Sequence, residues 1–188
     1  MPNLGDVTNC PGRRSVGAMT PAELLADAFD RVRESAEAAL EGLSPDELAH
    51  RPTPDANPIG WLVWHLARVQ DDHVAGVATV EGSEQVYTAA GFADRFALPY
   101  DVDSIGYGHS SDDVGAGSWE AGLLLDYLDA VHRRTRDFLA GLSEDDLDRV
   151  VDEHWDPPVT LGARLVSVVN DDTQHVGQAA YVRGLLGR

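Results

Sequence analysis

A short stretch of the sequence occurs twice, and this duplication constrains the fold more than any other feature. LEGLSPDEL at residues 40–48 matches LAGLSEDDL at residues 139–147. Each copy ends an amphipathic helical pattern and leads through a proline-containing loop into another apolar one. Two such helix–loop–helix halves pack most simply as a four-helix bundle, an all-α fold. Chance similarity around a common GLS-acidic turn is the alternative explanation.

Apolar periodicity places the four helices. The first begins with a start signal, in which Thr20 is the cap, Pro21 takes the first helical position and Glu23 fills the capping-box position. The expected helices cover about residues 21–42, 58–79, 118–142 and 160–186. The long connection between the second and third, residues 79–117, is polar and glycine-rich. A connection of this length in a compact domain is either functional or covers a site.

The chain has the length of one ordinary domain. Its 188 residues are 43% hydrophobic, enough for a sizeable core. Residues 1–18 show no periodicity and no apolar signal region, so we expect a disordered N-terminal extension, upstream of a true start at Met19. Residues 19–188 then form the bundle domain.

The charge and the missing residue types exclude several functions. The net charge of −18 argues against nucleic acid or an anionic membrane as a partner, and no apolar run is long enough to span a bilayer. Because the chain contains no lysine, a Schiff-base or P-loop mechanism is excluded. The single cysteine, Cys10, permits no internal disulfide and suits a reducing cytoplasm.

Charged residues interrupt the last apolar helix. Asp171, Asp172 and His175 lie in the middle of LGARLVSVVNDDTQHVGQAAYVRGLL. A buried carboxylate costs several kcal/mol unless it is paired or bound to a metal. Asp171 and His175 are four residues apart, so their side chains stack on one helix face and can converge on one ion.

The second helix offers a third ligand. His65 lies near the centre of its apolar face, and three ligands from two helices would leave coordination positions open, as in catalytic metal sites. Two simpler interpretations stay open. His65 can be a core histidine bonded to a carbonyl, and the aspartates can pair with arginines, for which the candidates are Arg68, Arg164 and Arg183.

The other candidate residues have weaker support. His73 can join the site, although a solvated helix end is the simpler interpretation. Aromatic residues of the long connection can line a pocket or plug the open end of the bundle, and Tyr107, His109 and Trp119 are the pocket candidates. A serine hydrolase is excluded because no GxSxG motif occurs.

Three segments resemble one known family. PIGWLVWHLARVQDDH, YGHSS and QHVGQAAYVRGLL are similar to the DinB-like (YfiT-like) metalloenzymes, with a match over about residues 20–186. The resemblance looks closest to the actinobacterial branch, which comprises mycothiol transferases and domains of unknown function. It implies an up-down-down-up bundle, often a homodimer, with a divalent metal held by His65, Asp171 and His175.

The resemblance also suggests a reaction. Many relatives have His at the position of Asp171, and the shorter Asp leaves Asp172 as the alternative carboxylate. Mixed nitrogen and oxygen ligands favour zinc, with nickel or iron next. The expected activity is transfer of a small thiol, mycothiol, to a small electrophile, with no assigned catalytic residue. The alternative is a non-catalytic metal-binding or stress-response bundle.

Overall fold

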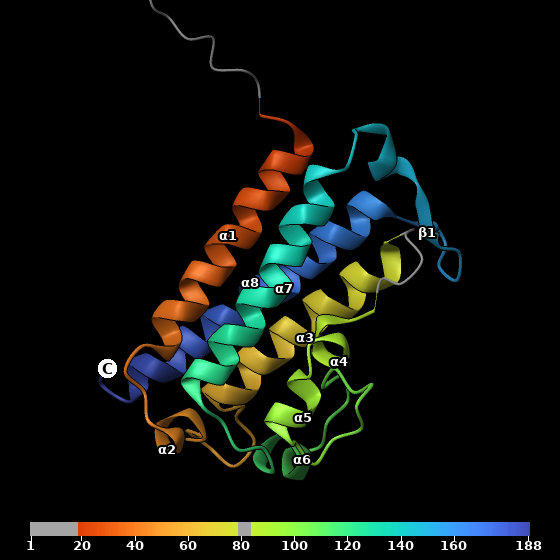
Figure 1. The fold of residues 1–188 in the computed structure, drawn as a ribbon. Helices are drawn as coiled ribbons and strands as arrows, with labels where there is room; N and C mark the ends of the chain where they lie inside the picture. The colour runs from red at the N-terminus through yellow and green to blue at the C-terminus, as the bar shows by residue number, and fades with distance from the viewer. Residues whose placement is uncertain (1–18, 79–83) are drawn as a thin grey trace, which may run out of the picture.

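The computed structural model describes residues 19–78 and 84–188. Four long helices dominate it: α1 (Pro21–Leu40), α3 (Ile59–Val77), α7 (Ala121–Ala140) and α8 (Leu161–Leu185) (Figure 1). Between them lie α2 (Pro45–Leu48), α4 (Val86–Ala89), α5 (Phe92–Phe96), α6 (Ser111–Gly115) and the 3₁₀ helix η1 (Asp145–Asp148). A two-stranded antiparallel hairpin, β1 (Val150–Asp152) and β2 (Val159–Thr160), precedes α8.

The predicted start of the first helix is confirmed. The side chain of Thr20 accepts a hydrogen bond from the Glu23 backbone, and the Glu23 carboxylate accepts one from the Thr20 backbone. The duplicated turns also share a structure. Ser44 forms the same reciprocal bonds with Glu47 at the start of α2, and Ser143 hydrogen-bonds Asp146 at η1.

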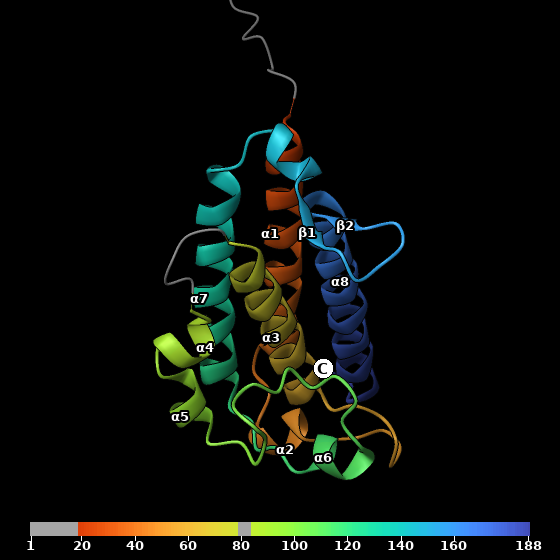
Figure 2. The ribbon, with the colours of Figure 1, turned by 90° about the vertical axis from the view of Figure 1, so that its right-hand side faces the viewer.

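The long helices form an up-down-down-up bundle, as predicted. α1 and α3 each pack against both α7 and α8, so α1 and α3 occupy opposite corners. α1 and α8 run in one direction, and α3 and α7 run in the other (Figures 1 and 2). The site can therefore be built between α3 and α8, which are antiparallel neighbours.

Helix α3 is the central element of the core. Every residue from Ile59 to Asp71 is buried, because α7, α8 and the segment from α4 to α6 surround this helix. The buried set includes four polar side chains: His65, Arg68, Gln70 and Asp71. Gln70 donates a 2.7 Å hydrogen bond to Thr135 of α7, so this polar pair joins two helices inside the core.

The structure refines the predicted boundaries. Gly42, at φ +70°, follows the end of α1 by two residues. Helix α7 starts at Ala121, after the extended Glu120 and the buried Trp119. The long connection contains the short helices α4, α5 and α6, and the hairpin before α8 was not predicted. The expectation of a disordered segment at 1–18 concerns residues outside the described part. No helix in the described ranges has the length and hydropathy to cross a membrane.

Candidate metal centre

His65 projects from the middle of α3 and is held on two sides. Its Nδ1 lies 2.5 Å from the carbonyl oxygen of Ile105, in the connection between α5 and α6. Because a carbonyl only accepts, Nδ1 carries the proton and the lone pair is left on Nε2. The ring of Trp61, one turn earlier, stacks on the imidazole with centroids 4.6 Å apart. Only 6% of His65 is exposed.

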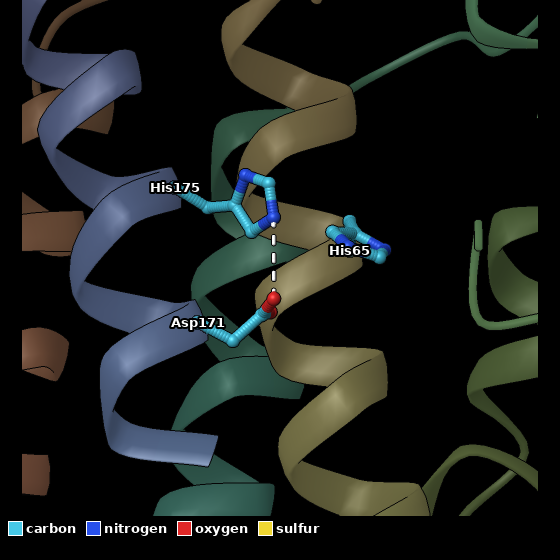
Figure 3. Close-up of side chains that lie close together, drawn as sticks. All are labelled: His65, Asp171 and His175. Atoms are coloured by element: carbon cyan, nitrogen blue, oxygen red, sulfur yellow. Dashed lines mark ion pairs between the residues drawn. The ribbon is translucent and has the colours of Figure 1, made fainter. Parts of the chain in front are cut away.

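Asp171 and His175 face His65 from α8. Nε2 of His175 lies 3.6 Å from Oδ1 of Asp171, as the dashed line in Figure 3 marks. Nδ1 of His175 lies 3.3 Å from Oε1 of Gln178, which directs Nε2 toward the carboxylate. The two imidazoles meet edge to face at 4.7 Å.

One ligand atom from each of the three residues lies within 4.8 Å of the other two. Bonds of about 2.0–2.2 Å to a metal need ligand atoms within roughly 4.4 Å of one another, which small side-chain rotations supply. A further observation fits an ion: Oδ2 of Asp171 is buried, and no residue of the described ranges hydrogen-bonds it. The residues therefore fit a divalent metal.

The three groups have coupled proton affinities. Burial lowers the pKa of His65, partly offset by the Ile105 carbonyl. The contact with His175 lowers the pKa of Asp171. Burial opposes a charge on His175, but the contact with Asp171 and its negative charge raise the net pKa of His175. A proton on His175 therefore occupies the position that a metal would take.

A hollow of about 170 Å³ lies beside two of the three residues, His65 and Asp171. Its lining includes His65 and Asp171 from the centre, His73 from α3, and Tyr107 from the connection. Tyr107 is 90% exposed and stands at its rim. The hollow can admit part of a small molecule next to these two residues.

Comparison with known proteins gives the family. The chain matches the DinB superfamily over residues 28–179. The chain belongs to the DinB superfamily. A conserved protein from Enterococcus faecalis, known from a crystal structure, is 31% identical with a TM-score of 0.83, and the alignment covers 91% of this chain and 100% of that one. The comparison with curated proteins finds no match.

In this DinB chain the arginines considered as partners of the aspartates bind elsewhere. Arg164 donates to Asp152, and Arg183 donates to the carbonyls of Ala39 and Glu41. Arg68 lies 3.8 Å from Asp71 of its own helix. The arginine-pair explanation for Asp171 and Asp172 is therefore wrong: among the described residues Asp171 pairs with His175, and neither Asp172 oxygen has a hydrogen-bond partner.

Asp172 lies apart from the cluster. It is fully buried on the core face of α8, and neither carboxylate oxygen has a hydrogen-bond partner within the described part of the chain. Burial, and the charge of Asp171, raise its pKa well above the ordinary value. The structure thus brings Asp171, and not Asp172, to the two histidines.

The pocket candidates of the DinB chain separate into three environments. Tyr107 borders the hollow. His109 accepts a 3.2 Å hydrogen bond from Trp61 Nε1, so its Nε2 carries the proton and donates to Ser104 Oγ at 2.9 Å. Trp119 is buried in the core against Trp64. The aromatic residues of α4 and α5 pack on Tyr127 and fill the side of the bundle: Tyr87, Phe92 and Phe96.

Sequence reasoning left the environment of several residues around this centre unassigned. His73 is only 30% exposed and lines the hollow, whereas a solvated position was the simpler expectation. Trp61 was visible as an aromatic residue four positions before His65, and Arg68 as a charge in an otherwise apolar stretch. The Ile105 carbonyl had no such signal, because any residue can supply a backbone acceptor.

Proposed function

We propose that this chain binds a divalent metal ion through Nε2 of His65, Nε2 of His175 and a carboxylate oxygen of Asp171. The observation that carries the proposal is that one possible ligand atom from each of the three residues, on two helices, lies within 4.8 Å of the others. Nε2 is the free nitrogen of each ring, because each Nδ1 already has a hydrogen-bond partner. A carbonyl or amide that holds the second ring nitrogen is the usual support of a histidine ligand. Two nitrogens and one oxygen favour zinc, with nickel or iron as the next choices.

We further propose that the chain is a thiol S-transferase that joins a small thiol to a small electrophile. Such an ion, when bound, would lower the pKa of a coordinated thiol, so that a thiolate forms near neutral pH. The hollow of about 170 Å³ beside His65 and Asp171 supports this proposal, because it offers space for a small thiol next to the proposed ion. The thiol loses its proton to solvent, its sulfur bonds to the electrophilic carbon, and the leaving group departs with its electron pair.

The composition supports an external nucleophile. The chain has no lysine, and its single cysteine, Cys10, lies outside the described residues. The role of the protein residues is then to hold the reactants: His65, Asp171 and His175 at the centre, with Tyr107 at the rim of the hollow. His109 and Trp119 support the surrounding loop and core. Resemblance to the actinobacterial branch suggests mycothiol as the thiol.

Metal content tests the first proposal. Protein purified without an affinity tag is analysed for metals as wild type, His65→Ala and His175→Ala, with the exposed His50→Ala as the matched control. We expect close to one ion per chain in wild type and His50→Ala, and loss of at least tenfold in affinity in the other two. Equal, negligible metal in all four proteins would overturn the proposal.

Thiol consumption tests the second proposal. Mycothiol, glutathione and bacillithiol are each combined with chlorodinitrobenzene or a bimane, and holo protein is compared with chelated and His175→Ala protein. Metal-dependent turnover with one thiol supports a transferase. Bound metal without turnover, and without thermal stabilisation by any thiol, supports the alternative of a non-catalytic metal-binding protein.

We also propose a homodimer that works in a reducing cytoplasm. The family resemblance supports the dimer, and the near-absence of cysteine supports the compartment. Light scattering coupled to size-exclusion chromatography at several concentrations measures the first point. A mass of one chain, 20.3 kDa, at all concentrations would contradict it.

A further inference from the structure

Arg68 is a fully buried charged residue whose guanidinium contacts backbone carbonyls as well as side chains. It is 0% exposed and lies three residues after His65 on α3. Nε donates to the Ser104 carbonyl at 3.1 Å, and Nη2 lies 3.5 Å from the Val102 carbonyl. Both acceptors belong to the connection that also supplies the Ile105 carbonyl to His65. Two side chains of α3, His65 and Arg68, therefore contact three backbone carbonyls of this segment, those of residues 102, 104 and 105.

The guanidinium is itself fixed in place. Nη1 donates to Gln85 Oε1 at 2.6 Å, and the guanidinium carbon lies 4.3 Å above the centre of the Tyr87 ring. Asp71 balances the charge at 3.8 Å. Gln85 in turn donates to Asp72 of α3 at 2.7 Å. The planar fork of arginine can serve these separate acceptors at once, whereas the single ammonium of lysine cannot.

The segment beyond Ser104 lies directly on His65. Gly106 is buried, and its backbone donates to Ser104 Oγ at 3.3 Å, which makes a tight turn around Ile105. Ser104 Oγ also accepts from His109. The position of the Ile105 carbonyl thus depends on a turn whose first carbonyls are bound by Arg68. Without that anchor the carbonyl can withdraw from the imidazole.

We propose that Arg68 is a positioning residue for His65: it fixes the 102–105 backbone so that the Ile105 carbonyl holds the His65 imidazole with its proton on Nδ1 and its lone pair on Nε2. The proposal rests on the proposed metal site for its functional meaning. Its structural content, the tautomer of His65, is independent of any metal. A free histidine side chain favours the Nε2–H tautomer, so the protein must impose the other one.

The first test uses metal-free protein. Nitrogen-15 NMR of the histidine rings, in chelator and above the pKa of His65, is recorded for wild type, Arg68→Lys and Gln70→Leu. Gln70 is the matched control, because it is a buried polar residue of α3 whose side chain donates its hydrogen bond to Thr135 of α7. We expect the Nδ1–H tautomer in wild type and Gln70→Leu, and a shift toward Nε2–H in Arg68→Lys.

The second test measures zinc affinity by competition with a chromophoric chelator. We expect a loss of about 10- to 100-fold in Arg68→Lys and a change of less than threefold in Gln70→Leu, the range found when groups that orient metal ligands are removed. Circular dichroism and thermal melts establish that each variant folds. Arg68→Met, which removes the charge as well, should lose at least as much affinity as Arg68→Lys.

The outcomes are distinct. Folded Arg68→Lys with the wild-type tautomer and affinity would overturn the proposal. So would failure of Arg68→Lys to fold while Gln70→Leu folds, because Arg68 would then serve the bundle as a whole. If wild type binds no metal but the tautomer shifts as expected, the proposed function fails and the positioning role stands.

Discussion

Gly106 packs closely against the candidate metal centre, next to the Ile105 carbonyl. It adopts φ +91°, and a Cβ at this position would lie 2.7 Å from His65 Nδ1 and 3.0 Å from Trp61 Cζ2. Gly108 has a similar φ of +77°, but a Cβ there would meet nothing within 4 Å. A substitution at Gly108 therefore tests backbone strain alone, whereas one at Gly106 tests backbone strain together with steric contact.

We predict that Gly106→Ala displaces the loop from His65, whereas Gly108→Ala does not. Both changes carry the cost of a left-handed alanine, about 1–2 kcal/mol. Gly106→Ala should lose at least 1 kcal/mol more in urea denaturation, and about tenfold or more in zinc affinity. Equal losses in the two variants would show that the contact with His65 is unimportant.

The neighbours Asp171 and Asp172 have pKa shifts of opposite sign. The folded pKa of Asp172 is raised by burial, so the folded state holds its proton more tightly than the unfolded state. Stability from this group is present below the unfolded pKa, about 3.9, and is lost as pH rises through the folded pKa. The folded pKa of Asp171 is lowered by His175, so its contribution is present above about 3.9 and is lost as pH falls through the folded value.

We predict opposite pH trends for the two amide variants in metal-free protein. Asp172→Asn cannot ionise and should gain stability relative to wild type as pH rises from 4 to 8, by at most about 1.4 kcal/mol per pH unit. Asp171→Asn should be less stable than wild type near neutral pH, with a difference that shrinks in acid. Urea denaturation at a series of pH values measures both, and parallel trends would contradict the assigned burial.

At the scale of elements, Asp71 attaches α4 to α3. Its carboxylate accepts 2.8 Å hydrogen bonds from the backbones of Val86 and Tyr87, and one of 3.0 Å from Tyr127 Oη. Asp72, the next residue, accepts a 2.7 Å hydrogen bond from Gln85, lies 3.8 Å from His73 Nδ1 and is 35% exposed. The Asp71 carboxylate therefore binds the backbone at the start of α4, whereas the Asp72 carboxylate binds a side chain near the surface.

We predict that Asp71→Asn frees the α4 segment and that Asp72→Asn has little effect. An amide oxygen cannot replace two carboxylate oxygens, so a buried donor is left unpaired at a cost of about 1–3 kcal/mol. Hydrogen exchange at Val86 and Tyr87 should accelerate in Asp71→Asn, and the Asp72→Asn variant provides the control. Unchanged protection in both proteins would show that other contacts hold α4.

The sequence predicted the long helices because their apolar periodicity extends over many turns. It also predicted the contribution of α8 to the site, since Asp171 and His175 are four residues apart and their proximity depends on helix geometry alone. His65 required only the additional step that α3 and α8 are neighbours. These parts depend on local rules and on the simplest packing of two hairpins.

The remaining features depend on tertiary contacts without a sequence pattern. The hairpin strands contain only two or three residues, too few for an alternating pattern to stand out. The Ile105 carbonyl reaches His65 across 40 positions of sequence, and its side chain plays no part in the contact. His73 was expected at a solvated helix end because the position of the connection over α3 was unknown.

At the scale of the whole molecule, the excess of acidic residues acts against the compact state. Asp and Glu number 32 against 14 for Lys and Arg. Ion pairs such as Arg33–Asp129 and Arg136–Asp30 join α1 to α7, but exposed pairs contribute at most about 1 kcal/mol each. Repulsion among the unpaired carboxylates should therefore dominate the response to salt.

We predict that the melting temperature rises as sodium chloride increases from about 10 to about 150 mM, because the screening length falls from roughly 30 Å to roughly 8 Å. Differential scanning calorimetry measures the shift. Arg136→Gln is a useful control, since removing a bridging cation should steepen the salt response. A lower melting temperature at the higher salt concentration would mean that the helix-bridging pairs outweigh the general repulsion.

The candidate centre lies between the two helical hairpins, so a bound ion would also link the two halves of the chain. His65 belongs to the first helical hairpin and Asp171 and His175 to the second, so an ion held by all three would fasten the two halves of the chain together. A cross-link that closes a loop of roughly one hundred residues removes about 4–5 kcal/mol of chain entropy from the unfolded state. Because the chain has one cysteine, the ion would act as a reversible cross-link in the place that a disulfide takes in other proteins. Chelation would remove that cross-link, and the force needed to pull the two halves of the chain apart would then decrease.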